Sequence, residues 1–217
     1  MASNNKVQFN TQKKLRLATK YNSVTKEIYF AAAKAINKNH ASIPGMEQIA
    51  KELGGSRGIL YYYFDSKGEL LHKMQCYVHE QLDKALKPIG MDNSLTPRQK
   101  LERVIRTYTL VLLDNADLVR ALWTDASLYE QPPKMRAVIV RRARGFYKQF
   151  EDLIAQTCGS EGLICSDKGA ATRLIMSMAD AICRWYRNDN GKLTAEQVAD
   201  YLVSSVFAGF LVPDKTR

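Results

Sequence analysis

Apolar side chains recur at intervals of three and four residues along almost the whole of this 217-residue chain. Such spacing places the side chains on one face of an α-helix. Six stretches show it, beginning near residues 24, 70, 101, 139, 171 and 198. The aromatic run at 59–64 resembles a strand in composition, but it is too short for its period to decide and would have no partner strand, so we interpret it as helical. The sequence predicts an all-α protein of about nine helices.

Helix start and stop signals accompany these stretches. Ser66, Thr96 and Thr194 are each followed three residues later by Glu or Gln, the pattern of a capping box at a helix N-terminus. The Pro-containing segments 88–90 and 131–133 predict breaks between helices. We therefore expect long helices to begin near residues 67, 97, 133 and 167.

The positive charge of the chain is concentrated in its first third. The sequence has 32 Lys and Arg against 22 Asp and Glu, a net charge of +10. Residues 1–73 hold 12 of these basic residues and 5 acidic ones, a net of +7, which leaves +3 for the rest. A basic lobe beside a nearly neutral one indicates a polyanionic partner for the first. A basic tail that serves solubility is the alternative that charge alone leaves open.

Several classes of protein find no support in the sequence. No run of 18 apolar residues is present and the N-terminus is polar, so we expect no membrane association and a cytoplasmic location. The four cysteines lack the spacing of zinc ligands and are expected to be reduced and mostly buried, so no metal or other cofactor is predicted. No grouping typical of a catalytic site can be placed, and we predict that the chain is not an enzyme.

Two short helices joined by a glycine turn are predicted inside the basic lobe. They span about 45–52 and 56–63, with Gly54 and Gly55 between them and Ser56 as the cap of the second. A short helix, a tight turn and another short helix describe a helix-turn-helix. Helical hairpins without a DNA partner are common, so this pattern alone leaves DNA binding open.

The run Leu60-Tyr61-Tyr62-Tyr63-Phe64-Asp65-Ser66-Lys67, together with residues 28–33 and 46–50, resembles the tetracycline-repressor (TetR) family. The resemblance covers about residues 24–73. It implies a flexible basic arm at 1–23, a three-helix DNA-binding domain at 24–73, and a ligand-binding and dimerisation domain at 74–217.

The resemblance also implies which residues contact DNA, because the 56–62 segment is the recognition helix of that family. The chemistry agrees for Arg57, which can make bidentate contacts to guanine. It agrees for Lys67, which stands in the first turn of a helix, where the backbone favours an anion such as phosphate. For Tyr61, packing in the core is the alternative. The predicted DNA-binding residues are Gly45, Met46, Ser56, Arg57, Gly58, Ile59, Tyr61, Tyr62, Tyr63 and Lys67.

The larger lobe is expected to bind a small molecule. Residues 183–199 resemble one branch of the TetR family, whose members respond to fatty-acyl or sterol-derived coenzyme A thioesters. The long helices also carry more large apolar side chains than a thin bundle requires, which predicts an apolar cavity. Its predicted lining is Tyr77, Tyr108, Trp123, Tyr129, Phe146, Phe150 and Met176, with Asp180 or Arg184 as a polar anchor. Ordinary core packing is the alternative for each of them.

The last two helices are predicted to form a homodimer. The helix at about 167–187 is apolar on most of its circumference and must be covered on two sides. The final helix carries the small residues Ser205 and Gly209, which allow close helix approach. Two such helices from each of two chains would form a four-helix bundle, and a helix-turn-helix needs two half-sites. The alternative is an ordinary monomer core.

Together these patterns predict a ligand-responsive transcriptional regulator, which in this family is most often a repressor. It would bind a palindromic operator in double-stranded DNA as a homodimer and be released by a small apolar effector, such as a fatty-acyl coenzyme A or a related lipid metabolite. Two alternatives come from other classes. One is an all-α enzyme or small-molecule carrier with a basic lobe, and the other is a non-specific nucleoid-binding protein.

Overall fold

The computed structural model describes residues 21–38, 43–123, 125–160, 166–187 and 193–209. Within these ranges the chain forms helices and no strand, which confirms the prediction of an all-α fold. No helix in the described ranges is long and apolar enough to cross a membrane. Of the predicted arm at 1–23, residues 1–20 lie outside the described residues, and 21–23 belong to the first helical segment.

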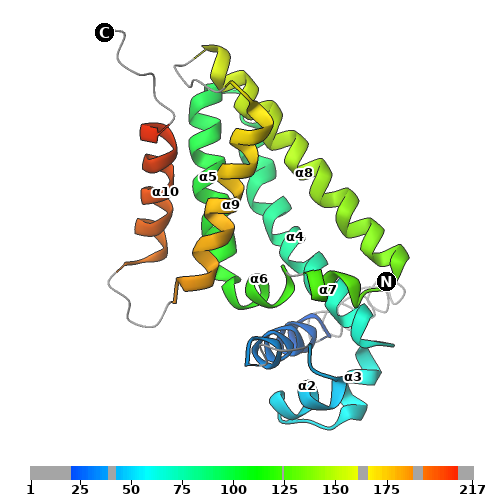
Figure 1. The fold of residues 1–217 in the computed structure, drawn as a ribbon. Helices are drawn as coiled ribbons and strands as arrows, with labels where there is room; N and C mark the ends of the chain where they lie inside the picture. Colours follow the sequence, from blue (N-terminus) through cyan, green and yellow to red (C-terminus); the bar gives the residue numbers. More distant parts are fainter. Residues whose placement is uncertain (1–20, 39–42, 124, 161–165, 188–192, 210–217) are drawn as a thin grey trace, which may run out of the picture.

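The helices form a small lobe at one end and an upright bundle above it (Figure 1). The small lobe consists of the helix at residues 21–38 together with α2 and α3. Helix α4 extends from that lobe into the bundle, and α6 and α7 lie between the two parts. The labelled helices are α2 (Met46–Glu52), α3 (Arg57–Tyr63), α4 (Lys67–Met91), α5 (Pro97–Asp114), α6 (Ala116–Leu122), α7 (Asp125–Tyr129), α8 (Pro133–Ser160), α9 (Lys168–Trp185) and α10 (Ala195–Gly209).

The small lobe has its own apolar core. Ile28, Ile49, Leu60 and Leu70, one from each of its four helices, are fully buried. At the surface, Glu52 of α2 forms ion pairs with Lys34 and Lys38 of residues 21–38, at 2.9 and 2.8 Å. These contacts fix α2 and α3 on the first helical segment.

Two of the three predicted capping boxes are complete; at Ser66 the hydroxyl accepts from the N–H of Glu69 at 3.1 Å, but the Glu69 carboxylate accepts from the N–H of Asp65 instead of Ser66. The Thr96 hydroxyl accepts from the N–H of Gln99 at 3.2 Å, and the Gln99 side chain accepts from the N–H of Thr96 at 3.0 Å. Thr194 and Gln197 make the same pair of bonds at 3.2 and 2.9 Å. Each pair satisfies two backbone donors that a helix start leaves without partners.

The predicted break at residues 88–90 is wrong, because α4 continues through Pro88 to Met91. Pro88 lies in the last turn of α4, where its missing N–H removes one helical hydrogen bond and little of the helix follows it. At its other end, α4 runs without interruption past residues 73 and 74, where we placed the boundary between the two domains. One rigid helix therefore belongs to both lobes.

The cysteines do not all match the prediction of reduced thiols. Cys76 and Cys183 are free, and Cys183 is buried. Cys158 is in a disulfide, so the prediction is wrong there. Cys165 lies outside the described residues. The described residues contain no cluster of three or more His, Cys, Asp or Glu that could hold a metal ion.

Candidate nucleic-acid interface and ligand cavity

The turn between α2 and α3 depends on a glycine. Gly54 has a φ of +73°, a conformation that other residues adopt only with strain. The N–H of Gly55 then bonds the carbonyl of Ala50 at 3.0 Å, and that of Gly54 bonds the carbonyl of Lys51 at 3.1 Å. These bonds close the end of α2 and reverse the chain so that α3 can begin at Arg57.

One face of α3 is buried and the other is open. Leu60 is fully buried, whereas Tyr62 is 80% exposed and Tyr61 is 43% exposed. Gly58 is exposed too, and a Cβ added there would meet nothing closer than the Ser56 hydroxyl at 3.7 Å. The open face therefore combines phenol hydroxyls with a flat stretch that allows close approach.

The other residues predicted to contact DNA surround this face to different degrees. Gly45, Ser56 and Ile59 are exposed. Tyr63 is half-buried, and its ring packs against those of Tyr21 and Tyr62 with centroids 5.1 and 5.0 Å apart. Met46 differs from the expectation, because its side chain is only 6% exposed and belongs to the core. Arg57 is the first residue of α3, and its side chain lies outside the described part of the structure.

Lys67, the last residue of the predicted DNA-binding set, contacts the larger lobe. Its ammonium group lies 2.9 Å from the carboxylate of Glu130, at the end of α7. Next to it, Gly68 packs so closely that an added Cβ would lie 2.6 Å from the carbonyl oxygen of Glu130 and 2.9 Å from Pro132 Cδ. The first turn of α4 is thus fitted against the segment that joins α7 to α8.

A cavity of about 300 Å³ lies among α4, α5, α6, α7, α8 and α9. Five of the predicted lining residues line its wall: Tyr108, Trp123, Phe146, Met176 and Asp180. The rest of the wall was not predicted and consists of Gln75, His79, Leu82, Leu122, Leu128, Ile139, Val140, Ala143 and Tyr147. Several of these residues belong to apolar helix stripes, but periodicity alone cannot separate a cavity wall from a packed core.

Four predicted lining residues lie outside this wall. The ring of Tyr77 faces the small lobe, 5.7 Å from that of Tyr29. Tyr129 is 70% exposed, and the guanidinium of Arg136 stacks on its ring. Phe150 lines a separate groove of about 700 Å³ among α4, α5 and α8. Arg184 is exposed. Helical phase decides these cases, because a side chain one position away along the helix points in another direction.

The polar feature of the cavity wall is a tyrosine–carboxyl pair. The Tyr108 hydroxyl donates to Asp180 Oδ1 at 2.9 Å. Burial raises the pKa of Asp180 from 3.8 to about 7, since the charged form loses its hydration. Burial and the neighbouring carboxyl also raise the pKa of Tyr108. Tyr108 further stacks on Phe146, with ring centroids 5.5 Å apart.

Two family sequence models match this chain, one in each lobe. The sequence model of the tetracyclin repressor-like C-terminal domain matches residues 94–210, and that of the bacterial regulatory proteins of the tetR family matches residues 31–74. The chain belongs to the TetR family. TetR proteins are transcriptional regulators that bind DNA, so the predicted fold and the predicted class of function are both confirmed. Curated protein sequences give no match to the chain.

Solved TetR-family structures share the fold. The ketosteroid regulator KstR2 of Mycobacterium tuberculosis is 24% identical, covers 88% of this chain and 97% of its own, and has a TM-score of 0.76. PfmR of Thermus thermophilus is 20% identical, with 83% of this chain and 97% of PfmR aligned and a TM-score of 0.72. AibR, solved with isovaleryl coenzyme A and operator DNA, is 22% identical, with 84% of this chain and 97% of AibR aligned and a TM-score of 0.69.

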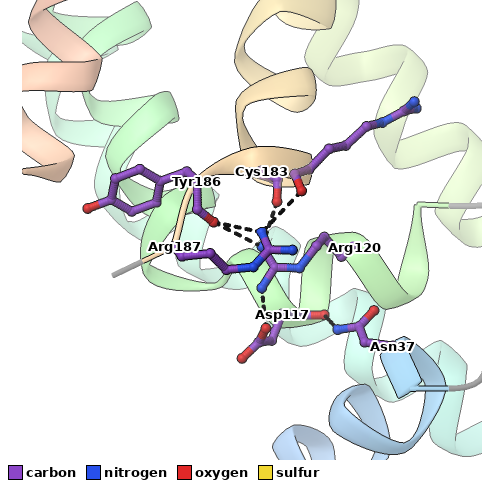
Figure 2. Close-up of polar contacts among 7 residues, drawn as sticks. Asn37, Asp117, Arg120, Cys183, Tyr186 and Arg187 are labelled. Atoms are coloured by element: carbon purple, nitrogen blue, oxygen red, sulfur yellow. Dashed lines mark hydrogen bonds and ion pairs between the residues drawn. The ribbon is translucent and has the colours of Figure 1, made fainter. Parts of the chain in front are cut away.

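In this TetR-family protein α6 joins the small lobe to the end of α9 (Figure 2). The side-chain amide of Asn37 donates to the carbonyl of Asp117 at 2.9 Å. Arg120 forms an ion pair with Asp117 and donates to the carbonyls of Cys183 and Tyr186, at 2.6 and 3.4 Å. Its guanidinium therefore satisfies acceptors that the C-terminus of α9 leaves without helical partners.

A row of apolar side chains on α9 is exposed in the single chain. Leu174 is 56% exposed, Met178 39% and Trp185 59%, and Ala181 lies exposed between them. Their spacing of three and four residues places them on one face of the helix. On α10, Tyr201 is also 63% exposed. We call these five residues the α9–α10 face.

Sequence reasoning did not single out Glu130, Gly68 and Arg120, which make contacts between separate helices. Each acts through a contact with a residue far along the chain, such as the pairing of Lys67 with Glu130. Local propensity and periodicity carry no signal for such contacts. Gly68 alone offered a hint, because a glycine in the first turn of a helix has a poor intrinsic propensity there.

Proposed function

We propose that this TetR-family regulator represses transcription by binding a palindromic operator as a homodimer, and that a small apolar effector releases it. The open face of α3 carries this proposal, because it presents Tyr61, Tyr62 and Gly58 outward over a fully buried Leu60. A rigid helix with exposed polar groups can enter the major groove, where base edges are read.

The residues around α3 support contacts of two kinds. The hydroxyls of Tyr61 and Tyr62 and the ammonium of Lys67 suit phosphate oxygens, which position a protein on the duplex. Arg57, at the start of α3, is the residue that we assign to a base edge, through bidentate bonds to guanine. Gly58 leaves room for the groove floor to approach the helix backbone.

The α9–α10 face supports the homodimer. It gathers apolar side chains that a single chain leaves in water, and burying them against a second copy is favourable by about 25 cal/mol for each Å² removed from water. A two-fold dimer would place two copies of α3 on one side of the assembly. Operators of this kind have half-sites about 34–36 Å apart, so the spacing of the two helices decides binding.

The cavity supports control by a ligand. Leu122 and Trp123, at the end of α6, line it, and the same helix holds Asn37 through Asp117 and the end of α9 through Arg120. A ligand that shifts α6 would therefore move the small lobe relative to α9. It acts as an inducer only if it binds the misaligned state more tightly than the DNA-binding state.

A fatty-acyl coenzyme A is the effector that relatives suggest. AibR was solved with isovaleryl coenzyme A, and residues 183–199 resemble the branch that responds to such thioesters. At about 300 Å³ the cavity is at the small end of ligand pockets, which span roughly 300–1,000 Å³. It offers room for an acyl group, while the nucleotide part would lie outside.

Binding of the purified protein to the DNA upstream of its own gene tests the proposal. We expect a dimer-sized complex that survives excess competitor DNA. An equal affinity for the upstream fragment and for competitor DNA would favour a nucleoid-binding protein. Absence of any DNA complex would favour the enzyme or carrier alternative. Transcription from the same fragment in a purified system, which should fall when the protein is added, tests the repressor role.

A further inference from the structure

The cavity wall holds a half-buried carboxyl group, that of Asp180, which has no ion-pair partner among the described residues. Among the described residues, the hydrogen bond from Tyr108 is the one that Asp180 accepts, and no ion pair includes it. Arg184 stands one helical turn away and is exposed; it attracts the carboxylate without forming an ion pair, and this attraction lowers the pKa of Asp180 by less than burial raises it. An ionised carboxylate in such a place is unfavourable unless it gains a partner.

The other walls of the cavity are suited to a cation. Four aromatic side chains line the space, those of Tyr108, Trp123, Phe146 and Tyr147, and aromatic rings attract positive charge to their faces. None of the lining residues is Lys or Arg. The remaining titratable base is His79, and burial lowers its pKa, which favours the neutral imidazole.

We propose that the effector is an apolar molecule with one protonated amine, whose ammonium group pairs with Asp180 inside the aromatic walls. This inference rests on the proposed function and names the chemical class of its effector. The amine gives Asp180 an ion-pair partner, which none of the described residues provides, and the apolar part of the ligand buries surface against residues such as Leu82, Ile139 and Met176.

The same lining disfavours an anionic effector. A carboxylate or phosphate in the cavity would face Asp180 and find no Lys or Arg on the wall. Lys87 and Lys100 line the separate groove among α4, α5 and α8, which shares only Phe146 with the cavity. An acyl coenzyme A thioester is therefore the competing class, and the experiment includes one.

The experiment uses three probes of one shape: 4-butylbenzylamine, 4-butylbenzyl alcohol and 4-butylbenzoate. They differ in carrying a positive, neutral or negative group. Calorimetric titration of the full-length protein at pH 8 should give an affinity for the amine about tenfold or more above that for the alcohol, since the charged pair forms beside aromatic rings and partly away from water. The benzoate should not bind measurably. The amine should also release the protein from its upstream DNA.

The variant Asp180→Asn keeps the shape of the side chain and removes its charge. We expect it to lose the amine preference about tenfold while it binds the alcohol as the wild type does. The matched control is Asp83→Asn, an acid of the separate groove that pairs with Arg142, and this variant should bind the amine normally. If Asp180→Asn does not fold, the ranking of the three probes on the wild type still decides.

Equal affinities for amine and alcohol would overturn the inference, as would an unchanged amine affinity in folded Asp180→Asn. Tighter binding of isovaleryl coenzyme A than of the amine would assign the cavity to the competing class. In all these cases, retained operator binding by the free protein leaves the proposed function standing. Loss of specific operator binding would instead refute the proposed function itself.

Discussion

Lys67 and Glu130 form an ion pair with 2.9 Å between the ammonium nitrogen and the carboxylate oxygen. The pair joins the first turn of α4 to the end of α7, and its lysine is the one that we assign to a DNA phosphate. Because one ammonium cannot serve both partners fully, Glu130 competes with the operator. We predict that Glu130→Gln increases operator affinity about two- to fivefold at low salt, the range expected for a partly exposed pair. Fluorescence anisotropy of labelled operator measures it.

The double variant Lys67→Ala/Glu130→Gln provides the control for this prediction. Lys67→Ala should weaken binding to all DNA sequences alike and reduce the salt dependence, because each lost phosphate contact removes about one from the slope of log affinity against log salt. In the Lys67→Ala background, Glu130→Gln should have no further effect. A gain of similar size in both backgrounds would show that Glu130 acts on DNA through its charge alone and not through Lys67.

Substitution by alanine should have opposite effects on stability at Gly68 and Gly58. A Cβ at Gly68 would lie 2.6 Å from a backbone oxygen, whereas one at Gly58 would meet only ordinary contacts. Gly68→Ala should therefore lower the free energy of unfolding by about 1–3 kcal/mol, as overpacking does. Gly58→Ala should retain or slightly raise stability, because alanine favours helix, and should weaken operator binding. Urea unfolding and anisotropy separate the two effects, and a stable Gly68→Ala would contradict the close packing.

The bonds of Arg120 to the end of α9 predict a loss of stability when they are removed. Arg120→Gln should lower the free energy of unfolding by about 1.5–3 kcal/mol, the range for hydrogen bonds to a charged group. Arg187 is the matched control, since it is exposed and, within the described ranges, bonds only the nearby carbonyls of Arg184 and Tyr186. Urea unfolding of Arg187→Gln should match the wild type within about 0.5 kcal/mol. Equal losses in the two variants would remove the special role of Arg120.

The carboxyl of Asp180 predicts how stability depends on pH. Its pKa is about 7 in the folded protein against 3.8 for a free carboxyl, so between these values the folded state holds a proton that the unfolded state releases. Unfolding free energy should therefore fall as pH rises from 4 to 8, by up to about 4 kcal/mol from this group. The groups that face it are Tyr108 of α5, Tyr147 of α8 and Arg184 of α9, with His79 of α4 on the same wall.

Asp180→Asn removes this titration, so it should be more stable than the wild type at pH 8 and similar to it at pH 4. Chemical unfolding at the two pH values measures the difference. Asp152→Asn is the control, because Asp152 is an exposed acid of α8 that pairs with Lys148. Its profile should follow that of the wild type. Parallel profiles for Asp180→Asn and the wild type would contradict a raised pKa of Asp180 in the folded protein.

The α9–α10 face predicts the effect of a charge placed on it. Leu174 is 56% exposed in the single chain, so Leu174→Glu should fold normally and fail to dimerise. Sedimentation should give a monomer, and operator binding should be lost because one half-site alone binds weakly. Val138→Glu provides the control, since Val138 is 48% exposed on α8. A dimeric Leu174→Glu would move the interface to another surface.

Local sequence patterns were sufficient for the helices and for the helix-turn-helix. The period of the apolar residues predicted the helical fold, and the Thr96–Gln99 and Thr194–Gln197 pairs marked two helix starts within one residue. Gly54 marked the turn, because few residues accept a positive φ. The prediction failed at Pro88, where its distance from the helix end, and not its identity, decided whether the helix continued.

The cavity wall was predicted only in part, and the reason is geometric. Composition indicated that the bundle holds excess aromatic residues, and Tyr108, Trp123 and Phe146 do line the cavity. Tyr77 and Tyr129 have the same chemistry but face the small lobe and the solvent. Helical phase and the crossing of neighbouring helices make that difference, and neither can be read from one segment of sequence.

The sequence by itself determined the helices, the basic DNA-binding lobe and the family, because each depends on residues close together in the chain. Only the tertiary structure decided that Lys67 pairs with Glu130, that Arg120 closes the end of α9, and that Asp180 accepts from Tyr108 in the wall of an aromatic cavity. These relationships join residues some 60 positions apart or more, or depend on a surrounding wall drawn from six helices. Packing creates them, and packing is a property of the folded chain.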